Sequence, residues 1–518
     1  MMHKRILAIG LGLALLAGAC SSADGEWADT TTDRYDPPPT TTGRYDAEET
    51  TTTYASEPYP DVSFDNPGVN RPMRTEDDAV STFALDVDTG SYSVARRFVD
   101  DGHLPDPDSV RVEEYVNYFD QGYPSPRSGV FAVYVDGAPT PYASDERSRV
   151  IRIGIQAEEI ADRDRKDASL TFVVDTSGSM AAENRLGGVR WALAQLVEEL
   201  RPTDTVALVE YGSEARVVME PTRVRDRDRI LDRIDSLRPN GSTNAAAGLD
   251  LGYRLARDAY VDRGINRVIL ASDGVANVGV TDAEGILDLI REDADDGIQL
   301  VTVGFGMGNY NDTFMEQLAD NGDGFYAYVD TLEEAERLFV EDLTGTLQTV
   351  AMDARVQVEF DPDAVSEWRL VGYENRHMDD RDFRNDSVDA GEIGAGHTVT
   401  ALYEVRLDRD VEYAPSLRDL GTFSLRWHEP GSDETREISR PIEVDDLADR
   451  FQSARPRFQL AVFVAEYAEI LRGDGRAYFS GTTLDDLAED LWRFDELADD
   501  ADVREFIDLV ESAARIRR

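Results

Sequence analysis

The feature that most constrains the fold is an alternation of short apolar segments with amphipathic stretches between residues 169 and 349. Each apolar segment has the length of a buried strand, and the stretches between them carry apolar residues at helical spacing. Strands that alternate with helices build a doubly wound parallel sheet through right-handed crossovers, so the pattern predicts an α/β fold. The expected strands are 170–174, 205–209, 267–270 and 300–303, and the expected helices are 186–200, 226–237, 245–262, 282–295, 313–320 and 332–346.

A different pattern flanks this segment on both sides. Alternating apolar and polar residues predict strands at 82–88, 129–135, 149–155, 354–360, 399–405, 422–427 and 436–442. Because strands of the same kind precede and follow the α/β segment, we predict that it is inserted into one β-rich module. Helical spacing predicts two helices before the insertion, at 92–101 and 109–119, and three that close the chain, at 458–471, 485–497 and 502–516.

The N-terminus carries the pattern of an export signal. A positively charged start precedes a short apolar run, and small residues lead up to Cys20. The segment resembles the lipobox of bacterial lipoproteins, which implies lipid attachment at Cys20; the alternative is an ordinary secretory signal cut nearby. No later segment has about 20 residues free of charges, so we expect no transmembrane helix. The expected location is the cell envelope, on the periplasmic or outer surface, with a lipid anchor in the membrane.

Composition limits the partners and the stabilising chemistry. With 53 Lys and Arg against 104 Asp and Glu, the formal net charge is -51, which excludes a nucleic-acid binder that works through a basic face. Cys20 is the only cysteine, so no disulfide can form within the chain.

The predicted regions are a signal peptide at 1–19, a disordered Thr/Pro/Asp-rich tether at 20–80, an N-terminal β-rich region at 81–164, the α/β domain at 165–348, a C-terminal β-rich region at 349–450 and a helical region at 451–518.

Polar residues gather where three loops of the α/β segment meet one edge of the predicted sheet. Asp175 ends the first strand and is followed by Ser177 and Ser179, Thr243 precedes a predicted helix, and Asp273 follows a later strand. In open α/β sheets, ligands bind at the carboxyl ends of the strands. Carboxylates and hydroxyls without Cys or His suit a hard octahedral cation, so the sequence predicts a site for Mg²⁺, with Mn²⁺ or Ca²⁺ as alternatives.

These three loops resemble the metal-ion-dependent adhesion site of von Willebrand factor type A domains. The resemblance covers residues 165–350 and implies that Ser177 and Ser179 bind the ion directly. It further implies that Thr243 binds it directly or through water, and that Asp175 and Asp273 act through water and through hydrogen bonds to the serines. An ion held in this way keeps an open coordination position, which implies a protein partner that supplies an Asp or Glu side chain.

The resemblance extends beyond the α/β domain. The segments at 81–93, 96–105 and 110–119 resemble the N-terminal region of a bacterial family of von Willebrand A lipoproteins, and residues 340–516 resemble its C-terminal region of unknown function. We therefore expect a lipid-anchored binding protein. An envelope scaffold with a structural metal is the alternative, and a metal-dependent hydrolase is less favoured.

Other motifs give little support to catalysis. The five histidines are scattered, and no His-Glu-x-x-His or Gly-x-Ser-x-Gly motif occurs, so we predict that the protein is not an enzyme. Asp86 and Asp88 resemble the start of a calcium loop but lack its closing Glu, and we expect a strand with these acids facing solvent. The glycines between Gly304 and Gly308 are interpreted as a tight turn.

Overall fold

The computed structural model describes residues 64–517 except for short gaps at 67, 144, 183–184, 275–285, 287–289, 292, 295, 310–311, 342, 410, 412–417, 433, 474–476 and 478–479. The predicted signal peptide, Cys20 and most of the predicted tether therefore lie outside the described residues. Within the described residues, no helix combines the length and the apolar character that crossing a membrane requires.

The α/β segment forms a six-stranded sheet with the strand order β10-β9-β8-β5-β6-β7. Its strands are β5 (Ala168–Asp175), β6 (Thr205–Tyr211), β7 (Ala215–Arg223), β8 (Ile265–Gly274), β9 (Gln299–Asn309) and β10 (Tyr326–Val329). Five strands are parallel, as predicted, but β7 is antiparallel to β6. The three residues between β6 and β7 are enough for a hairpin and too few for a parallel crossover. The sequence patterns did not predict β7 or β10.

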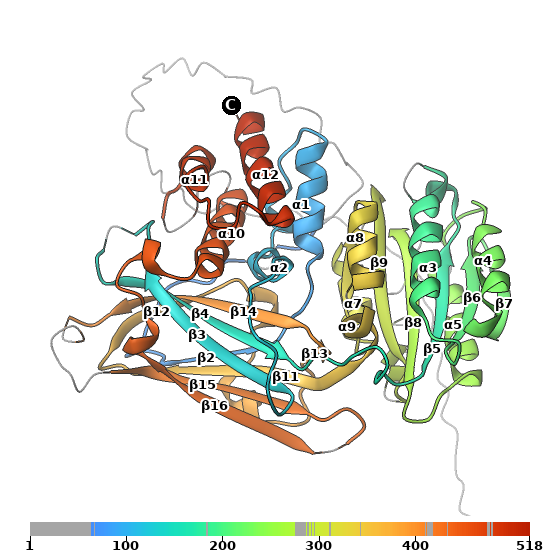
Figure 1. Cartoon of the computed structure of the whole chain (residues 1–518), viewed down its shortest axis with the longest axis horizontal. Coiled ribbons are helices and arrows are strands. Elements are labelled where there is room, and N and C mark those ends of the chain that lie inside the picture. Colours follow the sequence, from blue (N-terminus) through green and yellow to red (C-terminus); the bar gives the residue numbers. More distant parts are fainter. Residues whose placement is uncertain are drawn as a thin grey trace, which may run out of the picture. The chain divides into compact units, whose positions relative to one another are not determined.

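Helices cover both faces of this sheet (Figure 1). The helices α3 (Leu186–Glu199), α4 (Arg227–Asp235), α8 (Leu332–Glu336) and α9 (Leu343–Leu347) share one apolar core with alternate residues of the strands. The helices α5 (Ala245–Asp258) and α7 (Asp312–Asp320) share the core on the other face. The helix predicted at 332–346 is interrupted by a π-helical turn at Arg337–Glu341. Most of the helix predicted at 282–295 lies outside the described residues.

Two further sheets form the β-rich module. One has the order β1-β12-β14-β4-β3, and the other contains β13-β11-β15-β16 with β2 paired to β11. Their strands are β1 (Met73–Arg74), β2 (Val80–Ala84), β3 (Phe131–Pro139), β4 (Ser148–Ala157), β11 (Thr349–Phe360), β12 (Val365–Val371), β13 (Gly391–Gly394), β14 (Thr398–Leu407), β15 (Asp419–His428) and β16 (Thr435–Glu443). Because β2 pairs with β11 and β4 pairs with β14, strands from both sides of the α/β domain share sheets, which confirms the predicted insertion.

The alternation of side chains along β4 explains how the module is layered. Ile151, Ile153 and Ile155 point into the core between the two sheets, whereas Val150 lies in a separate core on the outer face. That outer core contains residues of α1 (Gly90–Asp100), α2 (Val112–Tyr118), α10 (Pro456–Arg472), α11 (Leu484–Leu491) and α12 (Ala501–Arg517). The two N-terminal helices therefore pack with the three C-terminal helices, as Figure 1 shows, although nearly 350 residues separate them in sequence.

Three predictions from the sequence are corrected by the structure. Met73 and Arg74 pair with β12, so the final part of the predicted tether is a strand. The strand β2 ends at Ala84, and Asp86 and Asp88 are buried beyond its end rather than exposed on it. The glycine-rich stretch interpreted as a tight turn belongs to the continuous strand β9, which reaches Asn309.

Candidate functional site

The sheet brings the ends of two strands together where the sequence predicted a site. The strands β5 and β8 are parallel neighbours, with Val174 opposite Ala271. Asp175 ends β5, and Asp273 lies near the end of β8. Because carboxyl ends of parallel strands share one edge of the sheet, these two residues from distant parts of the chain meet in one place.

Hydrogen bonds connect four of the five predicted site residues. Asp175 accepts hydrogen bonds from the backbone N–H of Ser177 at 2.7 Å and from the hydroxyl of Ser272 at 2.9 Å. Asp273 accepts one from the hydroxyl of Ser179 at 3.0 Å, and the Oγ atoms of Ser177 and Ser179 are 2.9 Å apart. Two carboxylates and three hydroxyls therefore form one continuous cluster, which we call the β5–β8 cluster.

The loop that contains Thr243 lies directly beside this cluster. The backbone N–H of Gly178 donates to the carbonyl of Gly241 at 2.9 Å, and the N–H of Asn240 donates to the carbonyl of Thr176. Thr243 itself is buried, with 3% of its surface exposed. The next residue, Asn244, caps the N-terminus of α5. Backbone hydrogen bonds therefore join the second loop to the first, so Thr243 belongs to a loop that borders the cluster.

The β5–β8 cluster holds two carboxylates that are buried away from the solvent, which disfavours their negative charge. Asp175 is fully buried and Asp273 is 2% exposed, whereas Ser179 is exposed to solvent. The pKa of Asp175 is raised to about 6, chiefly by burial and also by the neighbouring charge of Asp273, while hydrogen bonds from Ser177 and Ser272 oppose the rise. Two buried carboxylates at a solvent-facing edge are stabilised by any positive charge placed between them and the solvent.

One such charge comes from the chain itself. Nη1 of Arg185 lies 2.5 Å from Oδ2 of Asp273 and donates to the backbone carbonyl of Ser179 at 2.9 Å. Arg185 is not among the predicted site residues, because nothing in its local sequence distinguishes it from the many other arginines. Ser272 is also absent from the predicted site residues. Its hydroxyl donates to Asp175, and its Oγ lies 3.0 Å from the backbone carbonyl of Gly274.

The donor set of the β5–β8 cluster fits a hard divalent cation. All its side-chain donors are oxygens, supplied by two carboxylates and by serine hydroxyls, and the hydroxyl of Thr243 lies in the adjoining loop. This is the chemistry that Mg²⁺ prefers, with Mn²⁺ and Ca²⁺ as other oxygen-binding ions. The hydroxyls of Ser177 and Ser179 contact each other, and the hydroxyl of Ser179 also donates to the carboxylate of Asp273.

Among the described residues, two other groups of three acids lie close enough to share an ion. In the first, Asp86, Asp88 and Glu316 face Arg376, which lies 3.0, 3.6 and 3.0 Å from them and 2.9 Å from Asp320. We call these five residues the Arg376 cluster. A guanidinium thus already provides the positive charge, and the cluster joins the α/β domain to the β-rich module. The second group is Asp323, Asp389 and Glu392.

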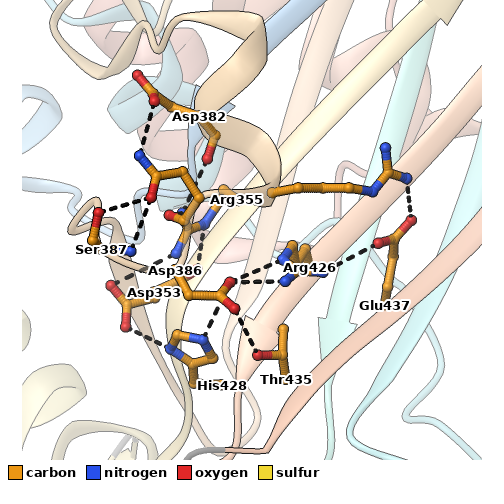
Figure 2. Close-up of polar contacts among 11 residues, drawn as sticks. Asp353, Arg355, Asp382, Asp386, Ser387, Arg426, His428, Thr435 and Glu437 are labelled. Carbon is orange, nitrogen blue, oxygen red and sulfur yellow. Dashed lines mark hydrogen bonds and ion pairs between the residues drawn. The ribbon is translucent and has the colours of Figure 1, made fainter.

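A polar network on the second sheet of the β-rich module surrounds His428 (Figure 2). Nδ1 of His428 lies 2.9 Å from Asp353, and Nε2 lies 3.6 Å from Asp386. Arg426 also donates to Asp386 at 2.8 Å, and Arg355 donates to two backbone carbonyls of the loop at 380–386. The network therefore attaches the loop at 380–386 to β11 and β15.

Three family models match successive segments of the chain. Residues 169–341 match the von Willebrand factor type A domain. Residues 59–150 match a model described as von Willebrand factor, and residues 345–516 match a model described as the C-terminal part of the uncharacterized protein YfbK.

Relatives match over most of the chain. Protein YfbK of Escherichia coli is 36% identical over 480 residues, which is 86% of this chain and 82% of that protein. Protein sll0103 of Synechocystis is 26% identical, over 60% of this chain and 71% of the relative. Among solved structures, a von Willebrand factor type A protein from Catenulispora acidiphila matches with a TM-score of 0.41 and 16% identity, over 68% of this chain and 81% of that chain.

Proposed function

Because the chain belongs to the family of von Willebrand factor type A proteins that contains Escherichia coli YfbK, we propose that it is a binding protein that recognises its partner through a divalent ion at the β5–β8 cluster. The partner contributes an Asp or Glu side chain. The protein is attached to the cell envelope by a lipid on Cys20 and acts outside the cytoplasm, without catalysing a reaction.

The observation that carries this proposal is the joining of Asp175, Ser177, Ser179 and Asp273 into one hydrogen-bonded cluster at the solvent-facing edge of the sheet. Helix capping explains a serine or an aspartate in a single loop. It does not explain why side chains from two strands, separated by almost 100 residues, direct carboxylate and hydroxyl oxygens at one another.

The residues of the cluster have separable tasks. Ser177, Ser179 and Thr243 offer neutral oxygens, whereas the buried Asp175 and Asp273 offer negative charge and orient the serines. A divalent ion that is bound by only a few charged ligands keeps a net positive charge. It also keeps a coordination position that attracts an anionic oxygen. Since Ser179 is exposed while both aspartates are buried, a partner's side chain reaches this edge from the side of Ser179.

Thermal unfolding of the purified full chain tests the ion. We expect Mg²⁺, Mn²⁺ or Ca²⁺ to raise the midpoint relative to EDTA, because a ligand that binds only the folded state stabilises it. Asp175→Ala should abolish this increase. The matched control is Asp250→Ala, which removes an equally charged but exposed residue of α5. An ion effect that survives Asp175→Ala would show that the ion binds elsewhere.

Capture from native envelope extract tests the partner and separates the scaffold alternative. A partner that is lost with EDTA and with Asp175→Ala, but kept with Asp250→Ala, supports ion-dependent recognition. A partner that stays bound in every case places the interaction outside the β5–β8 cluster and favours a scaffold. Labelling with a fatty-acid analogue tests the anchor, and Cys20→Ser should remove the label.

A further inference from the structure

The guanidinium of Arg185 is held beside the β5–β8 cluster by three different elements. Ser179, in the loop after β5, accepts a hydrogen bond through its backbone carbonyl, and Asp273 of β8 accepts one through its carboxylate. Gly306 of β9 packs against the side chain, since a Cβ there would lie 2.8 Å from Nε of Arg185. Gly306 has a φ of +80°, a conformation in which glycine avoids the strain that a side chain would cause. The position of Arg185 is therefore fixed by the fold.

This arginine lies at the entrance of the cluster. Its side chain is 16% exposed, while the carboxylate that it contacts is 3% exposed. Nη1 contacts both Ser179 and Asp273, and a guanidinium carries three further N–H groups on its other two nitrogens. A ligand that approaches Asp273 from solvent therefore meets the guanidinium of Arg185.

Arg185 and a divalent ion at the cluster compete for Asp273. If the guanidinium stays in place, it repels the ion, because like charges a few ångströms apart interact unfavourably even in water. If it moves away, it loses a short ion pair with a buried carboxylate. Either way Arg185 lowers the affinity of the cluster for the ion alone.

The effect of Arg185 on ion affinity reverses when a carboxylate ligand binds together with the ion. The negative charge of the carboxylate offsets the repulsion between the two cations, and the planar guanidinium can pair with both carboxylate oxygens. We propose that Arg185 is a specificity-determining residue that couples ion binding to carboxylate binding, so that the cluster holds its ion tightly only when an acidic ligand is present. This inference rests on the proposed function of the cluster.

Titration calorimetry with Mn²⁺ on the purified full chain, with and without acetate, tests the coupling. In Arg185→Gln we expect Mn²⁺ alone to bind about tenfold more tightly, the effect of removing one charge about 6 Å from a dication in water. We expect acetate to strengthen Mn²⁺ binding to the wild type and to have a much smaller effect on the variant. Acetamide, a neutral molecule of the same shape, should have no effect on either protein.

Two variants make the test specific. Arg190→Gln removes the same charge from α3, the helix that Arg185 precedes, at a residue whose ion pair with Asp235 is partly exposed, and it should leave Mn²⁺ binding unchanged. Arg185→Lys keeps the charge and should keep the weak binding of Mn²⁺ alone. Arg185→Gln that binds Mn²⁺ no more tightly than the wild type, or that keeps the full acetate effect, overturns the role of Arg185. A wild type that binds no Mn²⁺ even with acetate, together with an Arg185→Gln variant that binds none, overturns the proposed function, and this inference with it.

Discussion

The strongest prediction about stability concerns Glu466, a buried carboxyl on α10 that has no cationic partner among the described residues. Its neighbours are the hydroxyl of Ser480, which donates to it, and the like charges of Glu404 and Glu469. Burial, opposed by hydrogen bonds from Ser480 and Thr482, raises the pKa of Glu466 from 4.5 to about 7. A pKa change of one unit corresponds to about 1.4 kcal/mol, so ionisation of Glu466 lowers the free energy of unfolding by about 3 kcal/mol.

The direction of the pH dependence follows from the pKa of Glu466, which is 4.5 in the unfolded chain and about 7 in the folded chain. Below pH 4.5 the carboxyl is protonated in both the folded and the unfolded chain, so it costs nothing; above pH 7 it is ionised in both, and the full cost is present. Glu466→Gln remains neutral and can still accept the hydrogen bond from Ser480. We therefore expect this variant to be more stable than the wild type by about 3 kcal/mol at pH 8 and by about 1 kcal/mol at pH 5.

Urea denaturation followed by far-ultraviolet circular dichroism at both pH values measures this difference. Glu469→Gln is the matched control, because Glu469 lies one helical turn away and pairs with Arg369 at 3.2 Å and Arg472 at 2.5 Å. Removing that charge leaves two buried guanidinium groups with one partner fewer, so this variant should be destabilised at pH 8. A Glu466→Gln variant that is less stable at pH 8, or equally changed at both pH values, would refute the reasoning.

Two further predictions concern the joining of the domains and the packing of the helices. Arg376→Met should lower the free energy of unfolding by about 3 kcal/mol or more, because it removes the cation that Asp86, Asp88 and Asp320 share, while Glu316 keeps its pair with Arg111. Arg381→Met removes an exposed pair and should change the free energy of unfolding by less than about 1 kcal/mol. Gly252→Ala should destabilise the chain by about 1–3 kcal/mol, because the new Cβ would lie 2.4 Å from Val173. In Gly187→Ala the new Cβ would have no atom within 4 Å, so this variant should stabilise α3 by about 0.5 kcal/mol. Urea denaturation measures all four variants, and equal effects within either pair would contradict the packing argument.

Much of the architecture could be predicted from local patterns. The buried strands β5, β6, β8 and β9 are continuous apolar segments, and the helices between them carry an apolar face, so periodicity alone distinguishes them. The strand β7 was missed because it lies at the edge of the sheet, where only two of its nine residues are buried and the apolar pattern is weak. The short strands β1, β10 and β13 owe their conformation to pairing with neighbours from distant parts of the chain.

The sequence determined which side chains gather at the carboxyl edge of the parallel sheet. The end of a buried strand is a local property, and topology places such ends together, so Asp175, Ser177, Ser179 and Asp273 could be predicted to meet. Only the tertiary structure decided which charges those side chains face. Arg185 reaches Asp273 from outside the predicted motif, and Arg376 joins acids that the sequence suggested were exposed. Long arginine side chains span several ångströms between elements, so their partners depend on packing in three dimensions rather than on spacing along the chain.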